Sequence, residues 1–122
     1  MAAGIYNFTI EQGTTFTRTF NYKDSNGNPI DLEEAQELRM QIRENIDSLN
    51  PVEGGSFALN SGFTTSIPVG GNVSSSFTLV IPATTSSAFT FDRAVYDIEL
   101  VINNITTRLL QGKIKLSKEV TR

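Results

Sequence analysis

The sequence predicts an all-β protein: a single-domain antiparallel β-sandwich, Ig-like or jelly-roll-like, with long loops and one short helical turn. Short segments alternate apolar and polar side chains with a period of two, which is typical of half-buried strands. Clusters of Gly, Asn, Asp, Ser and Pro separate these segments, as turns do in a sandwich. The uncharged polar residues of the chain are mainly Thr, Ser and Asn, which suit exposed strand faces and turns better than helix surfaces.

The chain has the size of one domain. Its 122 residues can bury a core without covalent staples, and no repeat or linker divides them. Residues 1–122 are therefore expected to form one β-sandwich domain. The chain contains no cysteine, which excludes disulfides and thiolate metal sites.

Two strands are expected in the N-terminal part, over residues 5–10 and 14–22. In the first, Tyr6, Phe8 and Ile10 share one face. In the second, threonines alternate with a face that combines aromatic residues and an arginine, namely Phe16, Arg18, Phe20 and Tyr22.

Residues 31–49 carry two competing patterns. Asp31 and Glu34 resemble a capping box, and apolar residues recur from there to Leu49 at helical spacing, which favours a helix. However, Leu38, Met40 and Ile42 also alternate with polar residues, which favours a short turn followed by a strand. Local propensity slightly favours the helix, so the residues alone leave both structures open.

The second half of the chain begins with residues 50–76, which are rich in Gly, Ser and Asn. One or two short edge strands joined by mobile loops are expected there, with apolar islands at Phe57, Leu59, Phe63, Ile67 and Val69. A strand is expected over 77–81, which Pro82 ends. A single helical turn over 83–89, with Ala88 and Phe89 facing inward, completes this part.

The clearest strand is expected over residues 94–102, with even-numbered residues on one face. Asn103 and Asn104 tolerate the positive φ of a tight hairpin turn, so a partner strand is expected over 105–116. One face of that strand is expected to combine four residues: Leu110, Gly112, Ile114 and Leu116.

Few residue types in this chain support catalysis, because it has neither histidine nor cysteine. Asp97 and Glu99 share a strand face at a two-residue step of roughly 6.5–7 Å, a spacing that a glycosidase could use. A solvated polar face is the favoured interpretation of this pair. The loop from Asp24 to Pro29 has oxygen-bearing side chains around a glycine but no closing glutamate, so it is interpreted as a turn rather than a calcium loop. We therefore predict no catalytic, metal or cofactor site, and no enzyme.

Four arginines lie within expected strands: Arg18, Arg39, Arg43 and Arg108. An arginine on a sheet face can clamp a carboxylate of a partner, or it can pair with Asp97 or Glu99 of the same chain. The pairing within the chain is favoured.

Four apolar residues are candidates for anchors in a partner interface: Phe57, Phe63, Ile67 and Phe77. The alternative is that they close the core, and the sequence leaves both roles open.

Charge and hydropathy limit the partners. The formal net charge of −3 disfavours binding to phosphate backbones, so no nucleic-acid partner is expected. No apolar run approaches the length needed to cross a bilayer, so no membrane partner is expected either. The start of the chain, Met1 to Gly4, lacks the features of a signal peptide, which predicts synthesis in the cytoplasm.

Several stretches in order resemble small β-sandwich virion proteins of tailed bacteriophages, and look similar to the N-terminal module of baseplate upper proteins. The stretches are GTTFTRTF at 13–20, GNPIDL at 27–32, LRMQIR at 38–43, YDIEL at 96–100, TRLLQGKI at 107–114 and LSKEVTR at 116–122. In the family pattern the Asp-Leu turn leads directly into the Arg-flanked strand. The resemblance therefore implies a turn at 32–36 and a strand at 37–43. The segment from Glu33 to Glu37 departs from it by making the turn longer.

The resemblance implies a non-enzymatic virion structural protein, made in the host cytoplasm and located in the virion. It would be a tail or baseplate component, or an adaptor that docks fibres or other virion proteins, in several symmetric copies and through strand edges. One alternative is a capsid decoration protein. Another is a carbohydrate-binding module for host recognition, for which Tyr6, Tyr22 and Asn21 are the candidate residues.

Overall fold

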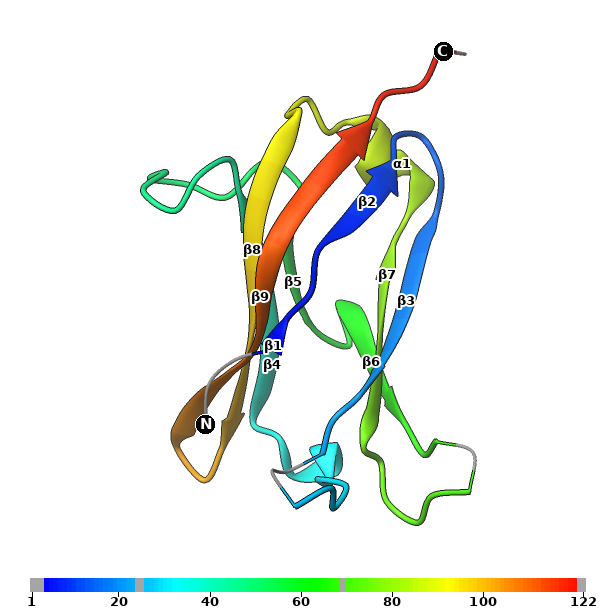
Figure 1. Ribbon diagram of the computed structural model, residues 1–122, viewed down its shortest axis with the longest axis vertical. Helices are drawn as coiled ribbons and strands as arrows, with labels where there is room; N and C mark the ends of the chain where they lie inside the picture. The colour runs from blue at the N-terminus through cyan, green and yellow to red at the C-terminus, as the bar shows by residue number, and fades with distance from the viewer. Residues whose placement is uncertain (1–3, 24–25, 69, 121–122) are drawn as a thin grey trace.

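The computed structural model describes residues 4–23, 26–68 and 70–120, and these form a β-sandwich with almost no helix (Figure 1). The loop from Asp24 to Pro29 lies partly outside the described residues, as does Val69. The strands and helical turns are β1 Gly4–Ile5, β2 Phe8–Glu11, β3 Phe16–Asn21, a 3₁₀ turn η1 Leu32–Glu34, β4 Glu37–Arg43, β5 Ser56–Leu59, β6 Gly62–Ser66, β7 Ser76–Ile81, α1 Ala83–Ser87, β8 Arg93–Ile102 and β9 Ile105–Ser117.

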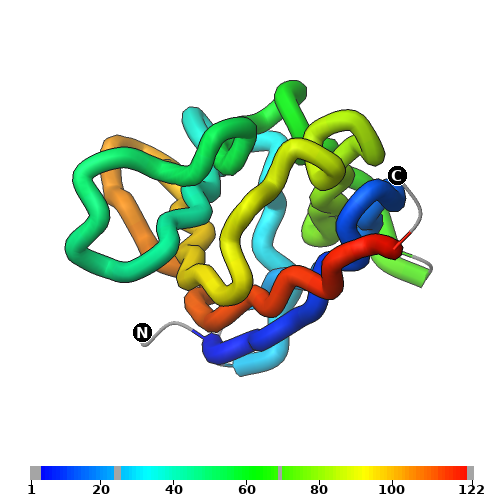
Figure 2. The backbone as a smooth tube through the Cα atoms, turned by 90° about the horizontal axis from the view of Figure 1, so that it is seen from above, coloured from blue at the N-terminus to red at the C-terminus, as the bar shows by residue number. Residues whose placement is uncertain are grey.

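The strands pair along one path, in the order β1-β9-β8-β4-β5-β6-β7-β3, with β2 also beside β9. The path folds over between β5 and β6, so β9, β8, β4 and β5 face a second layer of β6, β7 and β3 (Figures 1 and 2). Most pairs are antiparallel, but β1 and β2 run parallel to β9, and β5 runs parallel to β6. In chain order, β3 to β9 take the positions of strands B, C, C′, D, E, F and G in a variable-type immunoglobulin sandwich. The all-β sandwich is confirmed, in its Ig-like form.

The core lies between the two layers, and period-two alternation selects the side chains that enter it. Leu38, Met40 and Ile42 of β4 face Phe77 and Leu79 of β7 within the same buried cluster, and all five are at most 1% exposed. The ring of Phe8 stacks on that of Phe16 with centroids 4.9 Å apart. This contact ties β2, which pairs with β9 near one end of the strand path, to β3 at the other end. The sandwich is therefore closed by side-chain packing at the junction of β2 and β3.

The structure resolves the ambiguity of residues 31–49 in favour of the turn and strand. Asp31 caps the 3₁₀ turn by accepting a hydrogen bond from the Glu33 amide at 3.0 Å, and β4 follows. The helix alternative is wrong, because Ile46 and Leu49, which would complete its apolar stripe, are 83% and 93% exposed.

The short strands expected within residues 50–76 exist, but their placement at the sheet edge was wrong. β5 lies between β4 and β6, and β6 lies between β5 and β7. Phe57 and Phe63 are buried there because these strands join the two layers across the core.

The helical turn after Pro82 is confirmed as α1. Phe89 is buried as expected, whereas Ala88 is exposed, which corrects its expected inward direction. The polar group that anchors α1 is Ser86, which is fully buried. Its hydroxyl donates to the carbonyl oxygen of Thr14 at 2.7 Å and accepts from the Gly13 amide at 3.1 Å.

A β-bulge changes the face pattern of β9. The pairing with β8 shifts between Ile98, opposite Leu110, and Glu99, opposite Arg108, which leaves Leu109 as the extra residue. Leu109 is buried, and Leu110 is only partly buried. Ile114 and Leu116 share a buried face as expected, whereas Leu110, expected on the same face, is only partly buried.

The hairpin turn between β8 and β9 gives a first prediction. Asn103 and Asn104 both have positive φ, 53° and 62°, a conformation that costs most residues about 1–2 kcal/mol. We expect Asn103→Ala to lower the free energy of unfolding by about 1 kcal/mol, and Asn103→Gly to leave it nearly unchanged. Urea denaturation of both variants tests this, and equal losses would contradict the strain argument.

Candidate functional site

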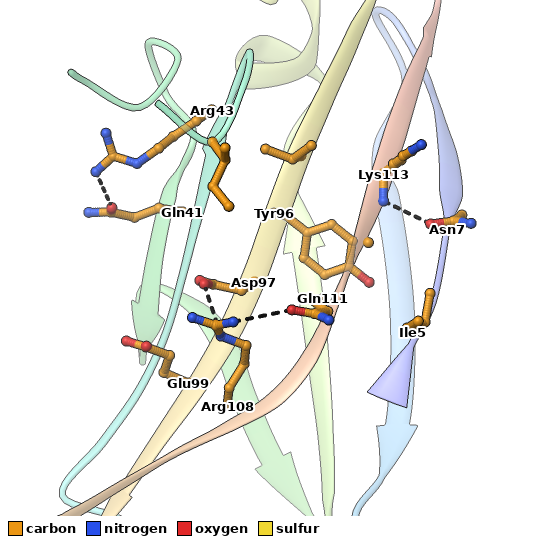
Figure 3. Close-up of a pocket in the computed structure, with 13 residues that line it drawn as sticks. Ile5, Asn7, Gln41, Arg43, Tyr96, Asp97, Glu99, Arg108, Gln111 and Lys113 are labelled. Carbon is orange, nitrogen blue, oxygen red and sulfur yellow. Dashed lines mark hydrogen bonds and ion pairs between the residues drawn. The ribbon is translucent and has the colours of Figure 1, made fainter. Parts of the chain in front are cut away.

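The outer face of the β4, β8 and β9 layer carries a groove of about 700 Å³, with Ile5 and Asn7 beside β9 (Figure 3). Ile46, on the loop after β4, also lines it. A second hollow of about 470 Å³ continues it and shares Asn7, Val95 and Lys113 with it. We call the two together the sheet-face groove.

Period-two alternation along β8 places Asp97 and Glu99 on one strand face, as the sequence predicted, and that face forms part of the groove lining. The cross-strand register then decides their neighbours. Glu99 lies opposite Arg39 on β4 and Arg108 on β9. Asp97 lies opposite Gln41 and Gln111.

Ion pairs within the chain occupy both carboxylates. Arg39 Nε lies 3.0 Å from Glu99 Oε1, and its Nη1 lies 2.8 Å from Glu37 Oε2. Arg108 Nε lies 3.4 Å from Asp97 Oδ2 (Figure 3). These side chains are partly exposed, so each pair contributes at most about 1 kcal/mol to stability. The pairing within the chain, favoured from the sequence, is confirmed for Arg39 and Arg108.

The other two arginines have different surroundings. Arg43 lies in the groove, where its Nη2 donates to Gln41 Oε1 at 2.8 Å (Figure 3). Arg18 lies on β3, in the other layer, with its guanidinium carbon 5.9 Å and 5.5 Å from the ring centroids of Tyr6 and Phe16. The structure thus brings three of the four arginines together and leaves Arg18 apart.

The far end of the groove is cationic. Val95 forms an apolar floor and lies opposite Arg43 and Lys113. Beyond it, Arg93 lies opposite Lys115. The groove therefore passes from an ion-paired carboxylate pair to an apolar floor, where the cations outnumber the single carboxylate, Glu44.

Three of the four predicted apolar anchors lie in the core. Phe57, Phe63 and Phe77 are 7%, 0% and 1% exposed, so in this fold they close the core and offer no surface to a partner. Ile67 is 58% exposed and just follows β6. The expectation of a four-residue anchor is thereby corrected for the three phenylalanines.

Exposed apolar residues at and near the groove were not predicted from the sequence as a site. Ile5 and Ile46 line it and are 75% and 83% exposed, and Leu49 is 93% exposed on the loop that carries Ile46. The turn formers Asn45, Ser48 and Asn50 around these apolar residues were the available signal for an exposed loop.

Burial is the largest cause of a raised pKa at Asp97, and the neighbouring Glu99 carboxylate adds to it. Arg108, Arg43 and Arg39 oppose the rise without cancelling it. The folded state therefore binds the carboxyl proton of Asp97 more tightly than the unfolded state does. As the pH rises from about 4 through the folded pKa, loss of this proton lowers the free energy of unfolding.

Asp97→Asn is therefore expected to flatten the decrease in the free energy of unfolding between pH 4 and neutrality. Urea denaturation at several pH values measures that slope. Glu37→Gln, which removes the more exposed carboxylate beside Arg39, is the matched control and should retain it. An unchanged slope in Asp97→Asn would contradict the assignment.

Residues 4–23, 26–68 and 70–120 also bear on metal, membrane and carbohydrate binding. In that part of the chain, no group of three or more metal-binding side chains comes together, and no helix is long and apolar enough to cross a bilayer. The aromatic residues named for a carbohydrate site, Tyr6 and Tyr22, are half-buried against the core, and Tyr6 packs edge-on against Phe20 with centroids 5.5 Å apart. Neither ring is an open platform for a sugar.

Comparison with known proteins gives a fold likeness alone. No family model matches the sequence, and no curated protein matches it. Among solved structures, the chain is similar to the NK cell receptor Nkp44, described as a triggering partner in natural cytotoxicity. The identity is 14%, the match covers 98% of this chain and 100% of that chain, and the TM-score is 0.41. We transfer no function from that receptor to this chain.

Proposed function

We propose that this protein is a non-enzymatic structural component of a bacteriophage virion, a tail or baseplate part or adaptor that docks neighbouring virion proteins. The observation that carries the docking role is a groove on one sheet face lined by the exposed side chains of Ile5 and Ile46, with Leu49 exposed on the same loop as Ile46. Apolar surface gathered beside a groove is typical of a protein interaction site. The assignment to a virion rests on the resemblance of the sequence stretches to phage β-sandwich proteins.

The Asp97 and Glu99 pair supports docking better than hydrolysis. Both carboxylates have an arginine of the same chain within 3.4 Å, whereas a glycosidase turns both of its carboxyl groups toward the scissile bond of the substrate. A charged groove with paired side chains selects a partner by electrostatic complementarity. The face is thus better suited to recognition than to proton transfer.

The test is gold labelling of intact phage particles with an antibody against this protein, viewed by electron microscopy. Label at the tail tip or fibre roots is the expected result. Label spread over the head would instead establish the capsid decoration role. Absence from purified particles, checked by mass spectrometry, would overturn the virion proposal.

A further inference from the structure

The loop after β4 projects from the body of the sandwich (Figures 1 and 2), and its residue Ile46 lines the sheet-face groove. We call residues 44–53 the prong. Its turn is held by its own hydrogen bonds, because the Ser48 amide donates to the Asn45 carbonyl oxygen at 3.1 Å and the Asn45 amide donates to Ser48 Oγ at 3.2 Å. Arg43 Nη1 also donates to the Ser48 carbonyl oxygen at 2.8 Å. The prong is therefore an ordered structure that presents Ile46 and Leu49 to solvent.

The prong is acidic, and the groove is basic. The prong contains Glu44, Asp47 and Glu53 and has no lysine or arginine. The side chains that line the groove include five cations, Arg43, Arg93, Arg108, Lys113 and Lys115, against three carboxylates, Glu44, Asp97 and Glu99. That excess of two positive charges occurs in a chain whose net charge is −3.

The apolar side chains of the prong also have a counterpart in the groove. Ile46 and Leu49 on the prong need a partner surface, and Val95 offers an apolar floor ringed by Arg93, Lys113 and Arg43. An acidic loop with two apolar side chains is complementary to a cationic groove with an apolar floor. The chain thus carries both halves of one contact.

We propose that the prong of one copy of this chain lies in the sheet-face groove of a second copy, and the reverse, about a two-fold axis. Ile46 lines the rim of its own groove, so prong and groove lie side by side on one face. Two copies brought face to face can then make the same contact twice. This inference rests on the proposed docking role of the face and names its partner.

The first test is sedimentation velocity of the purified chain over a range of concentrations. A monomer–dimer equilibrium is expected. The double variant Ile46→Asp/Leu49→Asp should weaken it by at least about tenfold, because both side chains lose their burial. Ile67→Asp, at an exposed apolar residue outside the groove, is the matched control and should leave it unchanged. Thermal denaturation confirms that each variant folds.

The decisive test is a charge exchange. Lys113→Glu/Lys115→Glu should weaken self-association, and so should Asp47→Lys/Glu53→Lys, since each variant alone opposes like charges. A mixture of the two restores both prong–groove contacts in a heterodimer, and equal or tighter association than in the unmodified chain is expected. A monomeric unmodified chain, or no recovery in the mixture, would overturn the inference. A chain that labels in the virion but stays monomeric would overturn the self-contact and leave the docking role standing.

Discussion

Replacing Phe63 with alanine is expected to lower the free energy of unfolding by about 3–5 kcal/mol. The side chain is fully buried, and its ring meets that of Phe77 edge-on with centroids 5.8 Å apart. On β6 it lies opposite Leu79 of β7 and beside Leu59 of β5, at the place where the strand path folds over between the layers. Alanine would leave a cavity where three strands meet, and rigid strands on three sides limit its collapse.

The measurement is urea denaturation, and Ile67→Ala is the matched control. Ile67 follows the same strand and is 58% exposed, so its replacement should change the free energy of unfolding by no more than about 0.5 kcal/mol. The comparison separates the two roles that the sequence left open for this group of residues. Equal, small losses at both positions would return Phe63 to the role of an interface anchor.

Local patterns in the sequence predicted most of the strands. In β4 the alternation of Leu38, Met40 and Ile42 is a property of neighbouring residues, and burial of one face follows from it directly. The hairpin turn at Asn103 and Asn104 is also local, because Asn tolerates positive φ without help from distant residues.

Features that depend on distant pairing could not be predicted in this way. The bulge that turns Leu109 inward depends on the register between β8 and β9, and a period-two pattern cannot mark the residue at which the period shifts. The interior position of β5 and β6 likewise depends on their pairing with β4 and β7. Their Gly, Ser and Asn content indicated an edge, whereas the topology places them inside the sheet.

In the candidate site, too, local features could be predicted from the sequence and features that depend on distant pairing could not. The shared face of Asp97 and Glu99 follows from two residues on one strand, but the arginines beside them come from β4 and β9, about sixty and ten residues away along the chain. The prong was missed because Ile46 and Leu49 fit a helical stripe as well as they fit an exposed loop. Only the end of β4 at Arg43 shows which of these the chain adopts.

Gly112→Val is expected to detach the N-terminal strands β1 and β2 from β9. A Cβ atom at this position would overlap the carbonyl oxygen of Tyr6 and lie 2.8 Å from its carbonyl carbon. Glycine permits this close approach of two backbones within a sheet. The loss of stability should lie near the upper end of the 1–3 kcal/mol range for overpacking, at about 3 kcal/mol.

Detachment of the N-terminal strands would break three hydrogen bonds near Gly112. The Tyr6 amide donates to the Gln111 carbonyl oxygen at 3.0 Å, and the Lys113 amide donates to Asn7 Oδ1 at 2.8 Å. The Tyr96 hydroxyl donates to the Tyr6 carbonyl oxygen, and burial raises the pKa of that hydroxyl, so it remains a donor across the usual pH range. Hydrogen exchange should therefore show lost protection at residues 6–11. Lys113→Val, the exposed neighbour, should retain it.

A double-mutant cycle makes the argument stricter. Tyr96→Phe alone should cost about 0.5–1.5 kcal/mol, the usual net contribution of one hydrogen bond. If Gly112→Val has already moved Tyr6 away, removal of the same hydroxyl in that background should cost much less, because its acceptor is no longer in place. Full additivity of the two losses would mean that Tyr6 stays beside Gly112 despite the added side chain. The N-terminal strands would then depend on contacts elsewhere, such as the stack of Phe8 on Phe16.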